Sequence, residues 1–91
     1  MPIYDDTAYH IAATLALDII EARPNVKDDT AADIAWETWK NSEAQGPDAK
    51  FQGACDSFEV IRAMQDIRSG SRSRVEHSPP ALEKALQRLD R

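Results

Sequence analysis

The chain has 91 residues with 16 acidic and 11 basic side chains, so it carries a formal net charge of −5. A chain of this length buries only about 60–65% of its unfolded surface, so we expect residues 1–91 to form a single domain with one core. Hydrophobic residues make up 42% and charged residues 30%, which excludes a wholly disordered chain and a membrane-spanning one. The composition predicts a globular protein in solution.

The single cysteine, Cys55, excludes an internal disulfide and is typical of proteins in a reducing compartment. We expect it to pack as a small apolar side chain. The pattern of a secretory signal is absent, since Asp5 and Asp6 stand where basic residues are required, and His10 and Asp18 interrupt the apolar run. These features predict a cytoplasmic protein.

A first helix is predicted over residues 8–23, because Asp5, Asp6 and Thr7 supply capping side chains and Pro24 stops the pattern. Its polar residues recur at intervals of four, four and three and form one narrow stripe: His10, Thr14, Asp18 and Glu21. The rest of its circumference is apolar, so the helix needs cover on several sides. That cover comes either from the other helices or from a second copy of the chain. Because three short neighbours do not readily cover so much apolar surface, we expect a homodimer.

A second helix is predicted over residues 27–44, followed by the helix-breaking residues Gly46 and Pro47. A third is predicted over about residues 49–69, with Gly70 as its terminator. The apolar stripe expected to face the core on this third helix comprises Phe51, Cys55, Phe58, Ile61 and Met64.

The segment 69–78 has no sustained periodicity and is predicted to be an exposed loop. Ser78, Pro79 and Pro80 then favour the start of a fourth helix, because proline loses no hydrogen bond in a first helical turn. The apolar stripe of this helix is Leu82, Ala85, Leu86 and Leu89. No segment alternates with the period of a strand. The sequence therefore predicts an all-α fold, a small bundle of about four helices.

Charge is distributed unevenly along the chain. The first forty residues hold eight acidic and three basic side chains, whereas the remainder holds eight of each. On the second helix, Asp29, Asp33 and Glu37 are spaced by four and form a ridge with about 6 Å of rise between carboxylates. Like charges at this spacing repel by a few tenths of a kcal/mol per pair, so the ridge costs some helix stability.

Two interpretations of this ridge are open. In the first, Asp28 and Asp29 stabilise the start of the helix while Glu37 pairs with Lys40 on an ordinary solvated surface. In the second, the carboxylates imitate a phosphate backbone and bind a basic groove of another protein, where charge complementarity speeds docking. Trp36 and Trp39 lie in one sector of the same helix, and they either pack in the core or anchor a partner.

Arg68, Arg72 and Arg74 form a basic counterpart in and before the predicted loop. The loop is expected to be a solvated connection or to contact an acidic surface, including that of a second subunit. Direct nucleic-acid binding is disfavoured, because three arginines are few, no aromatic residue flanks them, and the whole chain is acidic. No membrane contact is expected.

Residues typical of catalysis are sparse. His10 and His77 are the only histidines, and neither has a carboxylate or thiol at a metal-ligand spacing nearby. A glycine-rich phosphate loop and a nucleophile elbow are also absent from the sequence. We therefore expect a protein that is not an enzyme and that holds no cofactor and no metal.

The sequence favours a non-enzymatic protein-binding module. In size, composition and helicity the chain resembles the small phage-encoded inhibitors, a class that includes anti-CRISPR proteins and shares no motif. The resemblance implies an inhibitor that occupies a basic nucleic-acid-binding surface of a larger protein. The alternatives are a homodimeric structural, adaptor or assembly-chaperone protein, and a weak nucleic-acid binder that uses the loop Arg68–Arg74. The predicted partner-binding residues are Asp29, Asp33, Trp36, Glu37, Arg68, Arg72 and Arg74.

Overall fold

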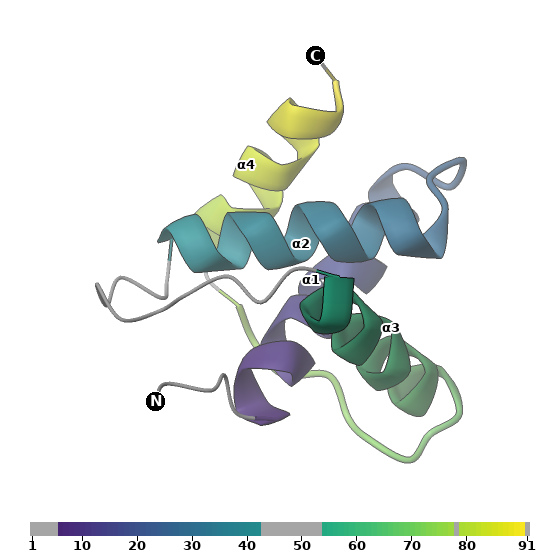
Figure 1. Cartoon of the computed structure of the whole chain (residues 1–91). Helices are drawn as coiled ribbons and strands as arrows, with labels where there is room; N and C mark the ends of the chain where they lie inside the picture. The colour runs from purple at the N-terminus through teal and green to yellow at the C-terminus, as the bar shows by residue number, and fades with distance from the viewer. Residues whose placement is uncertain (1–5, 43–53, 78, 91) are drawn as a thin grey trace.

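The computed structural model describes residues 6–42, 54–77 and 79–90. These residues contain helices and no strand, and they form the bundle drawn in Figure 1. The helices are α1 (Asp6–Ala22), α2 (Asp28–Ser42), α3 (Ala54–Arg68) and α4 (Pro79–Leu89). The all-α prediction is confirmed. None of these helices is both long enough and apolar enough to cross a lipid bilayer.

Local signals in the sequence set the helix ends. α1 stops before Pro24, and the N–H of Arg23 donates to the carbonyl of Ile19 at 2.8 Å to close the last turn. α2 begins at Asp28 with two acidic residues in its first turn, where the positive end of the helix dipole favours them. The predicted end of the second helix and the start of the third lie within 43–53, outside the described residues.

Gly70 ends α3 as predicted. It adopts a φ of 86°, a left-handed conformation that costs glycine little because it has no Cβ. Its N–H donates to the carbonyl of Ile67 at 3.1 Å, and the N–H of Ser71 donates to that of Asp66 at 2.9 Å. The chain therefore leaves α3 in a fixed direction, which starts the loop on its path toward α1.

α1, like α2, packs against all three of the other helices in the described part of the chain. Its apolar side chains are small or branched, and most are buried: Ala8, Ala12, Ala13, Leu15, Ala16, Leu17 and Ile19. The cover that the sequence demands for this helix is thus supplied within one chain. The burial of α1 therefore does not require a second copy, and the homodimer stays a prediction.

The inner face of α2 completes the core with alanines and one large ring. Trp36 has only 1% of its surface exposed, and its ring stacks between Tyr9 and Trp39 with centroid distances of 5.0 and 5.3 Å. Of the two interpretations of Trp36, the structure therefore supports the core. The prediction that Trp36 contacts a partner is corrected, because a partner cannot reach a side chain enclosed by these rings.

α3 turns part of the predicted stripe to the core, because Met64 and Ile61 face it as expected and Phe58 does not. Val60, Ala63 and Met64 are buried against α1 and α2, and Ile61 is half-buried, whereas Phe58 is 68% exposed. Phe58 lies outside the sector of α3 that its two neighbours cover. The expectation that Phe58 belongs to the core is therefore wrong. Phe51 and the side chain of Cys55 lie outside the described residues.

α4 packs against α1 and α2 through buried Ala81 and Ala85. Its end is tied to the α1–α2 connection by Arg23, whose Nε and a terminal nitrogen donate to the two carboxylate oxygens of Asp90 at 3.2 and 2.7 Å. These hydrogen bonds lower the pKa of the Asp90 carboxyl. The last helix is thus held by apolar contacts on one side and an ion pair at its tip.

Candidate functional site

Three carboxylates form an acidic face on α2, which we define as Asp29, Asp33 and Glu37. All three side chains are exposed, while Ala32 and Trp36 point into the core from the opposite side of the helix. The spacing of four residues in the sequence therefore corresponds to one continuous solvent-facing row.

The acidic face makes few contacts with the rest of the molecule. Asp29 Oδ1 accepts the N–H of Thr30 at 2.9 Å, and Asp33 accepts the hydroxyl of Ser57 on α3. Arg88 lies near Glu37, with 3.9 Å between Arg88 NH1 and Glu37 Oε2. Among the described residues, neither Asp29 nor Asp33 forms an ion pair.

The pairing expected between Glu37 and Lys40 involves a side chain outside the described set. What the structure does show is Arg88 of α4 near Glu37, at a distance typical of a weak, solvated pair. The negative charge of the acidic face is therefore only slightly reduced by contacts within the described part of the chain.

Asp28, one residue before the acidic face, behaves differently. The two terminal nitrogens of Arg68 donate to its two carboxylate oxygens at 2.6 and 3.0 Å. These hydrogen bonds lower the pKa of the Asp28 carboxyl and raise that of the Arg68 guanidinium. Arg68, predicted as a partner-binding residue, is thus engaged by its own chain.

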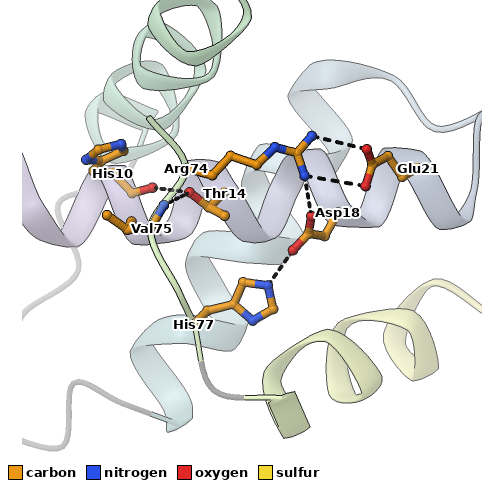
Figure 2. Close-up of polar contacts among 7 residues, drawn as sticks. All are labelled: His10, Thr14, Asp18, Glu21, Arg74, Val75 and His77. Atoms are coloured by element: carbon orange, nitrogen blue, oxygen red, sulfur yellow. Dashed lines mark hydrogen bonds and ion pairs between the residues drawn. The ribbon is translucent and has the colours of Figure 1, made fainter. Parts of the chain in front are cut away.

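The loop after α3 lies along the polar stripe of α1 (Figure 2). Its residues 71–77, which we call the strap, have no regular secondary structure. Arg74 reaches two carboxylates of the stripe, with 2.7 Å from NH1 to Asp18 Oδ1 and 3.2 Å from NH2 to Glu21 Oε1. The sequence left open whether this loop is solvated or contacts an acidic surface, and the acidic surface it contacts belongs to the same molecule.

Backbone and histidine contacts fix the rest of the strap. His10 Nε2 donates to the carbonyl of Ser73 at 2.5 Å, and the N–H of Val75 donates to Thr14 Oγ1 at 3.1 Å. His77 Nε2 donates to Asp18 Oδ2 at 2.6 Å, on the other side of the carboxylate from Arg74 (Figure 2). Every member of the polar stripe of α1 therefore holds the strap.

An open cavity of about 420 Å³ lies between the strap and α1, lined by Thr14, Asp18, Arg74, Val75, Glu76 and His77. Arg74 and His77 in this lining are both directed at Asp18, and Arg74 pairs with this carboxylate inside the molecule. Within the described residues, no group of three metal-ligating side chains gathers here or elsewhere. The cavity is thus bordered by an internal ion-pair network that fixes the strap.

Arg72, the last of the predicted partner-binding residues, lies beside α3. Its Nε is 3.6 Å from Asp66 Oδ2. All three predicted arginines therefore contact carboxylates of their own chain, and the surface they leave is much less basic than their number in the sequence indicates.

Comparisons with protein-family models, with curated proteins and with solved structures give no match to this chain. Its function is therefore inferred from its own residues. The structure keeps Asp29, Asp33 and Glu37 together at the surface, places Trp36 in the core, and pairs Arg68, Arg72 and Arg74 internally.

Proposed function

We propose that this protein is a non-enzymatic protein-binding module whose acidic face docks on a basic surface of a larger protein. The observation that carries the proposal is a contrast in pairing. Asp28 and Asp90 each form a bidentate ion pair with an arginine, and Asp18 pairs with Arg74. Asp29 and Asp33, by contrast, are exposed and form no ion pair within the described residues.

This contrast concentrates the excess negative charge. The chain carries five more acidic than basic groups, and internal ion pairs cancel part of the charge around α1 and at the end of α4. The acidic face retains its charge on a helix whose other side is anchored in the core. A rigid row of carboxylates of this kind accelerates encounter with a cationic surface and selects against anionic ones.

A basic groove that normally binds nucleic acid offers the matching chemistry, since it presents several lysines or arginines along a path. Occupation of such a groove by the acidic face excludes the nucleic acid, so the module acts as an inhibitor of the larger protein. Binding then weakens as salt rises, because exposed charges are screened over about 10 Å at 0.1 M ionic strength.

The test compares two double variants with equal changes in net charge. Asp29→Lys with Asp33→Lys reverses the acidic face, whereas Glu76→Lys with Glu83→Lys reverses two exposed carboxylates that form no ion pair among the described residues. Each tagged protein is used to capture partners from the cells in which it occurs, with and without competing DNA. Circular dichroism checks that each variant remains helical.

We expect a partner that the wild type and the Glu76/Glu83 variant both retain, that DNA and high salt displace, and that the Asp29/Asp33 variant fails to retain. If the Asp29/Asp33 variant retains that partner as well as the wild type does, the proposal is wrong. Equal losses in both double variants would also reject it, because the effect would then follow net charge alone and not the acidic face.

A further inference from the structure

The end of α1 and the start of α2 form an acidic corner, which we define as Asp18, Glu21 and Asp28. The short connection of residues 23–27 keeps the two helix ends near each other. Two arginines from a distant part of the chain close this corner: Arg68 pairs with Asp28, and Arg74 pairs with Asp18 and Glu21. The acidic corner is thus covered by a basic segment of the same chain, residues 68–74.

These contacts differ from the packing of the core. The side chains of Arg68 and Arg74 are 43% and 44% exposed, so their ion pairs are partly solvated. Exposed pairs contribute about 0.2–1 kcal/mol each. No residue of the strap belongs to the buried hydrophobic cluster. The Arg68 side chain and residues 71–74 can therefore leave the acidic corner while the apolar contacts between the helices stay intact.

We propose that the basic segment 68–74 is an autoinhibitory contact, whose arginines occupy carboxylates that a basic partner would otherwise bind. The inference rests on the proposed function, because it assigns the partner the same chemistry: several arginines or lysines on one surface. Displacement of Arg74 frees Asp18 and Glu21, and displacement of Arg68 frees Asp28. The anionic surface offered to the partner then extends from α2 onto α1.

The competition favours partners with many cations. An intramolecular arginine competes at an effective concentration on the order of millimolar, so a single cationic side chain in solution does not replace it. A surface with several cations binds the acidic face first. Its remaining cations can then displace Arg74 and Arg68 from their carboxylates one at a time. The basic segment therefore raises the number of cations that a partner must present.

The test uses an arginine nonapeptide as the cationic probe, titrated into the full-length chain at low salt. Arg74→Gln removes the cation from Asp18 and Glu21, and Arg62→Gln is the matched control. The control removes the same charge and frees a carboxylate outside the corner, because Arg62 lies 3.8 Å from Glu59. We expect Arg74→Gln to raise the affinity for the peptide by up to about fivefold, and Arg62→Gln to raise it less.

A second readout does not depend on any variant folding. In the free protein the N–H of Val75 donates a hydrogen bond to Thr14 on α1. The rate of hydrogen exchange at this amide therefore reports whether the strap is in contact with α1. We expect the peptide to accelerate exchange at Val75 in the wild type while the amides of the core helices stay protected. Unchanged exchange at Val75 in the saturated complex would overturn the inference.

The two proposals fail in different ways. If the peptide binds equally well to the wild type and to the Asp29→Lys, Asp33→Lys variant, the acidic face is not the docking surface and the proposed function is wrong. If binding depends on Asp29 and Asp33 but Arg74→Gln matches Arg62→Gln, the acidic face stands and the autoinhibitory role of the basic segment is rejected.

Discussion

The polar stripe of α1 and the acidic face of α2 are both rows of polar side chains spaced by about one helical turn. The first row is covered by contacts within the chain, whereas the second is exposed to solvent. The strap covers the stripe of α1, and each of the four residues of the stripe contacts the strap (Figure 2). The acidic face of α2 stays exposed, and in the described part of the chain it meets the hydroxyl of Ser57 on α3 and Arg88 on α4.

The difference lies in what surrounds each carboxylate. Asp18 is 22% exposed and receives both Arg74 and His77, so its charge is largely matched inside the molecule. Asp33 is exposed to solvent and meets a neutral hydroxyl. The first kind of carboxylate contributes to stability, and the second is available for binding. Three predictions test this division, and the largest effect is expected at Asp18.

Replacing Asp18 by Ala is expected to lower the free energy of unfolding by about 2 kcal/mol, because Arg74 and a largely buried His77 both lose their shared acceptor. Asp33→Ala serves as the comparison on the open row and should change it by no more than about 0.5 kcal/mol. Urea denaturation followed by circular dichroism measures both. Equal losses would show that the two rows do not differ in the way their contacts indicate.

The sequence predicts the helices, but it does not predict which carboxylates are paired inside the molecule and which stay exposed. Capping residues, Pro24 and Gly70 act within a few positions along the chain, so they predict where α1 and α3 end. The spacing of Asp29, Asp33 and Glu37 likewise places them on one face, because helical geometry is local.

Contacts between distant residues carry no such signal. Arg68 and Asp28 are 40 positions apart, and Arg74 and Asp18 are 56 apart. Nothing in the local pattern tells which arginine meets which carboxylate. The prediction that Phe58 lies in the core is wrong for a related reason. The spacing of Phe58 fits an apolar stripe, but the positions of α1 and α2 decide which sector of α3 is covered. The sequence therefore predicts rows of charge, and the tertiary fold decides which of them are neutralised.

A smaller effect is expected at Asp28, whose pairing with Arg68 sharpens the contrast with Asp29 beside it. Hydrogen bonds from Arg68 lower the pKa of Asp28 in the folded state, so the pair stabilises the fold above the unfolded pKa of about 4, and this contribution is lost as pH falls through the lower folded pKa. Because the pair is partly exposed, Asp28→Asn should cost at most about 1 kcal/mol at pH near 7. Urea denaturation across the pH range should show the two proteins converging in acid, and a difference that persists or grows there would contradict the pairing.

The smallest change in stability is expected on the acidic face itself. Asp33→Asn with Glu37→Gln removes like charges from neighbouring turns, which repel by a few tenths of a kcal/mol per pair. An asparagine can still accept the hydroxyl of Ser57, so little is lost in exchange. We therefore expect the free energy of unfolding to stay constant or to rise by about 0.3 kcal/mol, while retention of the basic partner falls. Under the proposed function, the carboxylates that bind the partner weaken the fold slightly. A clear loss of stability in this double variant would instead place the acidic face among the structural contacts and remove its distinction from the stripe of α1.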